Sequence, residues 1–143
     1  MSIVDAVSGD SLSPLVKPAI TQEQLRHYAE ASGDFNPIHL DEAAARRVGL
    51  DGVIAHGMLS MAFLGQFVNQ QIVGIPDAYL AHLQVRFSSM VRLGDTITCQ
   101  GTVKERVSTP DGRTLVHLTC QAQNQHAVTV TAAEATVSLP IGA

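Results

Sequence analysis

An acid, an amide and two imidazoles lie close together in the segment 33–59, GDFNPIHLDEAAARRVGLDGVIAHGML. Asp34 and His39 are five residues apart, so on a regular helix their side chains would point about 140° apart. Pro37 also opposes a helix, because it lacks a backbone donor and moves the preceding Asn36 toward extended or turn geometry. We therefore predict a tight polar loop that turns the Asp34 carboxylate and the His39 imidazole toward a common point.

A carboxylate beside an imidazole can take up and release a proton. The alternative is structural, because Asp and Asn side chains often hydrogen-bond their own backbone in turns, and Asp34-x-Asn36-Pro37 alone fits such a turn. The neighbouring His39 favours the chemical interpretation. Which of Asp34 and His39 would remove a proton stays open, since two neighbouring titratable groups can titrate as a coupled pair.

The second part of the pattern is the segment from His56 to Val68, which is apolar nearly all round. Such a pattern is typical of a helix buried on most sides, and it is too short and too often interrupted to span a bilayer, which needs about 20 apolar residues. Gly57 at its start would leave backbone N–H groups open to a carbonyl oxygen that gains negative charge. A glycine needed only for close packing is an equal alternative.

Two short helices are predicted on either side of the polar loop. The first begins at Thr21, which forms a capping box with Gln24, and ends at the glycine stop Gly33. The second begins at Asp41 and ends at Gly49, with two arginines in its last turn, where cations suit the helix dipole. Both flanks of the loop would therefore be anchored.

The C-terminal half alternates apolar and polar residues, as half-buried strands do. The apolar members are Leu83, Val85, Phe87, Ile97, Cys99, Val103, Val116, Leu118, Cys120, Val128, Val130, Ala135, Val137 and Leu139. Turn signals at 93–95 and 109–112 separate the segments, and the connections are short enough for antiparallel neighbours. We expect an α+β fold in which about four antiparallel strands wrap around one buried helix.

Length and composition limit the classes of function. A chain of 143 residues without linker or repeat predicts a single domain over residues 1–143. The net charge of −4 and the absence of a Lys/Arg cluster argue against nucleic acid or a membrane surface as partner. The N-terminus has no basic region followed by an apolar run, so we expect a cytoplasmic location.

No metal or cofactor motif is found in the sequence. Cys99 and Cys120 form no ligand or redox motif, and we interpret them as reduced residues of strands. Four further histidines are scattered without the spacing of metal ligands: His27, His82, His117 and His126. We therefore expect neither a metal nor another cofactor.

The run from Tyr28 to His39, followed by Ala55-His56-Gly57-Met58-Leu59, resembles the signature of the MaoC-like hydratase/dehydratase family. That family has the hot-dog fold, in which an antiparallel sheet wraps around a central helix. It includes R-specific enoyl-CoA hydratases and the B-type subunits of heterodimeric (3R)-hydroxyacyl-ACP dehydratases of type II fatty-acid synthesis. The resemblance implies reversible hydration of trans-2-enoyl thioesters to (3R)-3-hydroxyacyl thioesters, with acyl-CoA or acyl-ACP as substrate.

The resemblance also implies roles for single residues. Asp34 and His39 match the pair that holds and activates the water, and Asn36 matches the loop amide that supports them. Gly57 matches the residue whose N–H polarises the thioester carbonyl, and His56 sits beside it in a supporting position.

One position departs from the pattern of the family. Some R-specific hydratases carry a serine eight residues after the glycine, where this chain has Gly65. Ser60 is the nearest hydroxyl in this helix, and we list it as a supporting residue. It could replace that serine, pack, or hydrogen-bond the backbone; we favour packing.

Other interpretations remain open. A hot-dog thioesterase normally has a carboxylate on or near the central helix, and the segment 57–68 contains none. A noncatalytic acyl-binding subunit would lose the acid and base that Asp34 and His39 supply. Within the enzyme interpretation, the chain could be a CoA-dependent homodimer or the catalytic half of an ACP-dependent heterodimer. We expect a dimer whose two sheets join edge to edge, with each site completed by the partner, because a lone wrapped sheet exposes its edges.

Overall fold

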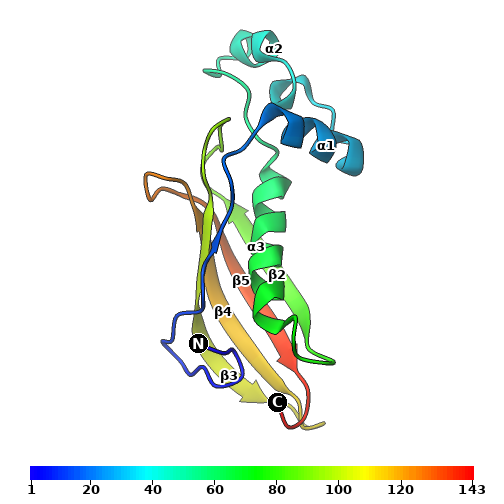
Figure 1. Ribbon diagram of the computed structural model, residues 1–143, viewed down its shortest axis with the longest axis vertical. Helices are drawn as coiled ribbons and strands as arrows, with labels where there is room; N and C mark the ends of the chain where they lie inside the picture. The colour runs from blue at the N-terminus through cyan, green and yellow to red at the C-terminus, as the bar shows by residue number, and fades with distance from the viewer.

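The computed structural model describes residues 1–143, in which four long antiparallel strands curl around one long helix (Figure 1). The strands are β2 (Tyr79–Phe87), β3 (Thr98–Ser108), β4 (Thr114–Gln123) and β5 (Thr129–Leu139), with a two-residue strand β1 (Leu15–Val16) at one edge. The helices are the central α3 (Gly57–Ile72), the shorter α1 (Gln22–Ser32) and α2 (Glu42–Arg47), and a 3-10 turn η1 (Pro37–His39). This arrangement confirms the predicted α+β hot-dog fold. None of the helices is long and apolar enough to cross a bilayer.

The strand order is β1-β3-β4-β5-β2, so β2 and β3 are not neighbours. The expectation that each short connection joins antiparallel neighbours is correct for β3 and β4, and wrong for β2 and β3. The segment 88–97 crosses the end of the sheet instead of turning back, because its backbone bonds to other segments. Val91 accepts a hydrogen bond from Ala55 N (2.7 Å), and Asp95 accepts one from Ile20 N (2.9 Å).

The central helix α3 packs one side against the face of the sheet that curls around it. The buried apolar residues of this side are Leu59, Phe63, Leu64, Phe67, Val68 and Ile72. Gly101 of β3 permits the close approach, because a Cβ placed there would lie 2.9 Å from the Phe67 ring. The other side of α3 is open, with Met58 53 % exposed and Ala62 and Gln66 also exposed. The expectation from the sequence that this helix is buried on most sides is therefore wrong for a single chain.

The two edges of the sheet differ. The edge at β3 is covered by the N-terminal segment, in which β1 pairs with β3, Ser11 bridges Thr102, and Leu12 N donates to Gly101 O (2.9 Å). The edge at β2 has no neighbour beyond it. An uncovered strand edge presents unpaired N–H and C=O groups. One side of the sheet is therefore left ready for pairing.

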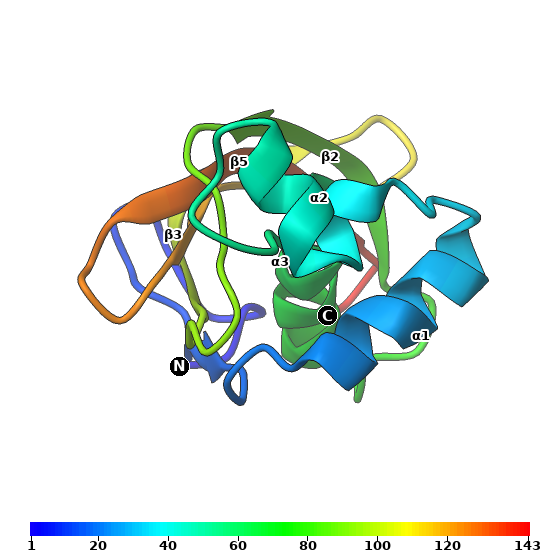
Figure 2. The same ribbon diagram turned by 90° about the horizontal axis from the view of Figure 1, so that it is seen from above.

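The short helices are capped as the sequence predicts. Thr21 Oγ1 accepts from Gln24 N (3.1 Å), and the C-cap Gly33 has a left-handed φ of 78°. Asp41 caps α2 by accepting from Ala43 N (2.9 Å). Figures 1 and 2 place α1 and α2 over the end of the molecule at which α3 begins. The polar loop between them is thereby brought to the N-terminus of α3.

Candidate active site

The loop after α1 orients the Asp34 carboxylate. Asp34 N donates to Ser32 Oγ (3.2 Å), and Asn36 N donates to Asp34 Oδ1 (3.1 Å). Asn36 Oδ1 in turn accepts from Ile38 N (3.2 Å), so this amide caps η1. These are side-chain turns of the kind that Asp and Asn favour. The predicted tight loop is confirmed, and the second carboxylate oxygen, Oδ2, is directed toward His39.

The His39 ring is held with a defined nitrogen facing Asp34. Its Nδ1 lies 2.8 Å from the carbonyl oxygen of Ile54, and the residue is 7 % exposed. A carbonyl oxygen only accepts, so Nδ1 carries the proton and Nε2 of the neutral ring has a free lone pair. Nε2 lies 3.8 Å from Asp34 Oδ2. This distance is too long for a direct hydrogen bond, but a single water with two bonds of about 2.8 Å can bridge it.

The His56 ring lies beneath both groups. Its Nε2 is 3.0 Å from the backbone oxygen of Asp34, and its ring stacks on His39 with centroids 3.9 Å apart and planes at 27°. The Tyr28 ring approaches His56 as well, with a centroid distance of 4.7 Å. Burial, and then the Asp34 carboxylate, raise the pKa of the Tyr28 hydroxyl, so Tyr28 keeps its proton.

Gly57 opens α3 next to this cluster. The His56 side chain makes no capping bond, so the first N–H groups of the helix are available to a ligand. A Cβ at Gly57 would lie 3.5 Å from the Phe87 ring, an ordinary contact, and close packing therefore does not require glycine. A cavity of about 320 Å³ adjoins this position, lined by His39, Ile54, Ala55, His56, Gly57, Ser60 and residues 87–91.

Ser60 belongs to a short chain of hydroxyl groups. Its Oγ donates to the carbonyl oxygen of Gly57 (2.8 Å) and lies 2.6 Å from Thr131 Oγ1. Because the Ser60 hydroxyl donates its hydrogen to the Gly57 carbonyl oxygen, the Thr131 hydroxyl must be the donor in the bond between Ser60 and Thr131. Of the alternatives left open for Ser60, the structure shows the hydrogen bond to the backbone and not packing alone. Gly65 has no neighbour within 4 Å of an added Cβ, so no other side chain takes the place of a serine there.

The cluster also has atoms that a metal could contact. Asp34, His39 and His56 each offer one such atom, all within 4.8 Å of one another. The lone pairs of an imidazole lie in its plane, and the two nearly parallel rings direct theirs side by side instead of toward one point. A tetrahedral site needs converging ligands, so the geometry does not suit a resident metal.

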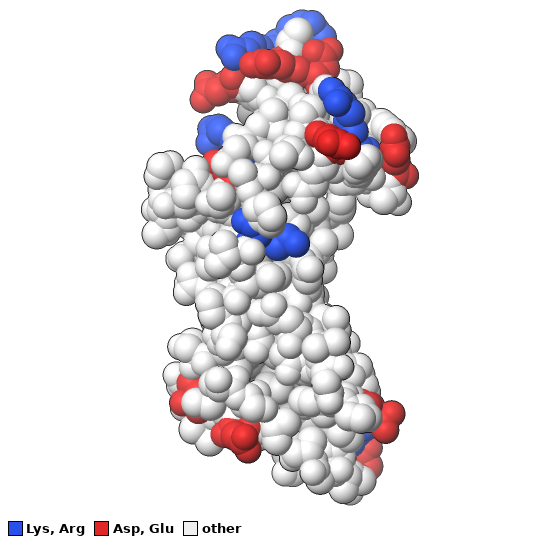
Figure 3. Space-filling view, viewed as in Figure 1, with Lys and Arg blue, Asp and Glu red and all other residues white.

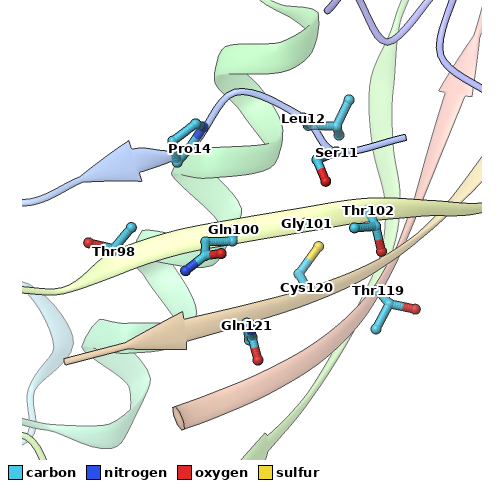
Figure 4. A pocket seen from close by; sticks show the side chains of 10 residues that line it. All are labelled: Ser11, Leu12, Pro14, Thr98, Gln100, Gly101, Thr102, Thr119, Cys120 and Gln121. Carbon is cyan, nitrogen blue, oxygen red and sulfur yellow. The ribbon is translucent and has the colours of Figure 1, made fainter. Parts of the chain in front are cut away.

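A larger cavity of about 530 Å³ lies on β3 and β4 beneath the segment 11–14 (Figure 4). Its lining consists mainly of hydroxyl and amide side chains, with Cys120 as the one titratable group. Burial raises the pKa of Cys120 to about 12, and that of Cys99 likewise to about 12. Both thiols therefore stay protonated and unreactive, and this cavity has no acid or base for catalysis.

Charged side chains gather mainly at the two ends of the visible face (Figure 3). At the end of the candidate site, Arg46 pairs with Glu42 at 2.8 Å, and Arg92 lies 3.8 Å from Asp51. All four side chains are largely exposed, so these pairs contribute little to stability.

The structure thus brings together Asp34, His39, His56 and the start of α3. Asn36 supports the loop through its backbone and side chain, and its exposed amide is directed to Ile38. The sequence did not identify Ile54 and Phe87 as residues of the site. Ile54 acts through its backbone carbonyl and Phe87 comes from a strand whose position depends on the whole sheet, so neither has a local signal in the sequence.

The chain resembles known proteins along most of its length. The model of the MaoC like domain family matches residues 6–131. An (R)-specific enoyl-CoA hydratase of Rhodospirillum rubrum is 33% identical over 69% of this chain and 67% of its own length. A mitochondrial 3-hydroxyacyl-[acyl-carrier-protein] dehydratase of Arabidopsis thaliana is 32% identical over 54% of this chain and 45% of its own. The solved (R)-hydratase from A. caviae involved in PHA biosynthesis has a TM-score of 0.81 and 27% identity, covering 95% of this chain and 98% of that one.

Proposed function

The chain belongs to the MaoC-like domain family, and from this premise we propose that it hydrates trans-2-enoyl thioesters reversibly to (3R)-3-hydroxyacyl thioesters. One observation carries the proposal. His39 Nε2 and the carboxylate oxygen Oδ2 of Asp34 are 3.8 Å apart, at the N-terminus of α3. Relatives named hydratase and dehydratase support the same reaction.

Each step of hydration has a group to perform it. A water bridging His39 Nε2 and Asp34 Oδ2 donates a hydrogen bond to each and directs its oxygen to C3 of the substrate. The proton of the water passes to Nε2, because an imidazole takes up and releases protons near neutral pH, and Asp34 stabilises the cation. The N–H of Gly57 binds the thioester oxygen as it gains charge. His39 then returns the proton to C2, and dehydration follows the reverse path.

The purified chain should be assayed alone against crotonyl-CoA and longer trans-2-enoyl-CoA substrates. We expect loss of the enoyl thioester without added metal or cofactor, and formation of the 3R alcohol. A 3S product would contradict the proposal. Release of free CoA without hydration would instead indicate a thioesterase, although α3 contains no acidic residue to serve as its catalytic carboxylate.

A second candidate is the catalytic subunit of a heterodimeric dehydratase that acts on acyl-ACP. The relative named 3-hydroxyacyl-[acyl-carrier-protein] dehydratase favours this possibility. Matched crotonyl-CoA and crotonyl-ACP substrates distinguish the carriers by the ratio of their kcat/KM values. A chain that is inactive alone on both carriers, and active after a second hot-dog subunit is added, would support the heterodimer.

We further propose that the single domain of residues 1–143 acts as a homodimer. Two observations support this. β2 is the one edge of the sheet without a covering segment, and α3 beside it exposes a face that includes Met58 and Ala62. Pairing of two β2 edges would continue the sheet and cover these faces.

A further inference from the structure

We propose that His56 is a positioning residue that fixes the relative positions of Asp34 and His39 through a ring whose proton is on Nε2. In this role it acts through Asp34 and His39 and not on the reacting atoms. The inference rests on the proposed function for its kinetic test and is independent of that function for its spectroscopic test.

His56 contacts both members of the pair by different means. Its Nε2 lies 3.0 Å from the backbone oxygen of Asp34, which fixes the start of the polar loop. Its ring face supports the His39 ring at a centroid distance of 3.9 Å. The ring is itself confined, because the residue is 2 % exposed and Tyr28 packs against it at 4.7 Å. One side chain thus sets both the Asp34 backbone and the His39 ring plane.

The hydrogen-bond pattern determines the tautomer of His56. The Asp34 carbonyl oxygen can only accept, so Nε2 of His56 carries a proton. The other nitrogen, Nδ1, is buried and has no partner. A proton placed on Nδ1 would be a buried donor without an acceptor, which is unfavourable. The contacts of the ring therefore assign the tautomer with the proton on Nε2 and a bare Nδ1.

The catalytic pair needs such support because its spacing is narrow. His39 Nε2 and Asp34 Oδ2 are 3.8 Å apart, so a shift of either group by about 1 Å would break one bond to a bridging water. Misplacement on that scale reduces turnover by about 10²-fold. The Ile54 carbonyl fixes one end of the His39 ring but not its tilt, which the stacked His56 ring does.

Three variants separate the two contacts. His56→Phe keeps a ring for stacking and loses the donor, His56→Gln keeps an N–H donor and loses the ring, and His56→Ala loses both. We expect His56→Ala to lower kcat by about 10²-fold with KM little changed, and the other two each to recover part of it. The control Val116→Ala removes a buried side chain of β4 outside the site cluster, and should lower the melting temperature but not kcat.

Two kinetic outcomes would overturn the inference. One is a His56→Ala variant with wild-type kcat. The other is a decrease in kcat that has the same relation to the decrease in melting temperature in the His56 variants as in Val116→Ala. This pattern would indicate a general structural role.

The spectroscopic test uses the wild-type protein without substrate. Long-range ¹H–¹⁵N correlation NMR at neutral pH should show His56 protonated at Nε2 and bare at Nδ1, and His39 with the opposite tautomer. A proton on Nδ1 of His56 would overturn the inference. If NMR shows the expected tautomers but the protein hydrates no enoyl thioester, the proposed function is wrong and the tautomer assignment is still correct.

Discussion

In the proposed function the Gly57 N–H binds the thioester oxygen, and this N–H can be removed without breaking the helix. Proline is favoured at the first position of a helix, and His56 before it has φ −58° and ψ 132°, which suit a residue that precedes proline. We expect Gly57→Pro to lower turnover by about 10²- to 10³-fold, the usual effect of losing one oxyanion donor.

The control is Gly57→Ala, which keeps the N–H and places its methyl group in ordinary contact with Phe87. We expect this variant to lose much less turnover. Both variants should melt close to the wild type in a thermal scan. Equal turnover in Gly57→Pro and the wild type would show that this N–H does not stabilise the thioester oxygen.

At the residue scale, the sequence predicts those parts of the site that depend on local geometry. The spacing of Asp34, Pro37 and His39 excludes a shared helix and predicts a turn, and the structure confirms that turn. The stacking of His56 on His39 could not be predicted, because it joins two segments through tertiary contacts. For the same reason the sequence leaves open which nitrogen of His39 is free, since the Ile54 carbonyl decides it.

At the scale of elements, the contact between α3 and β3 depends on Gly101. A methyl group there would meet the Phe67 ring at 2.9 Å and the Cys120 sulfur at 3.1 Å. We expect Gly101→Ala to lower the free energy of unfolding by about 1 to 3 kcal/mol, as overpacking of a core does. The control Thr102→Ala changes the neighbouring exposed residue and should stay within about 0.5 kcal/mol. Urea denaturation measures both, and equal stability of the two variants would contradict this account of the packing.

Helix limits were predictable because caps are local. Thr21, Gly33 and Asp41 each act on residues within four positions along the chain, and the structure has these caps where the sequence predicts them. Strand order was not predictable, because the segment 88–97 is held by residues far away in the sequence. Its crossing takes β2 to the far edge of the sheet and brings Phe87 to the cavity beside Gly57.

At the scale of the whole molecule, the proposed homodimer predicts that an added charge disrupts the dimer on one face of the chain and leaves the dimer intact on another. Ala62→Arg places a cation on the open face of α3, and we expect sedimentation to report a monomer with little hydratase activity. Thr102→Arg places the same charge on the outer face of β3 and should leave the dimer and its activity intact. A wild-type monomer with full activity would refute the expectation that each site needs its partner.

The central claim is that Asp34 and His39 act together on one water, and a double-mutant cycle tests it most directly. Asp34→Asn and His39→Gln should each lower turnover with a trans-2-enoyl-CoA by about 10²- to 10⁴-fold, because general acid/base groups contribute that much. The double variant should be little slower than either single one, since groups that act as a unit are not additive. Near wild-type turnover in either single variant with an unchanged melting temperature, or two effects that multiply in the double variant, would contradict the claim.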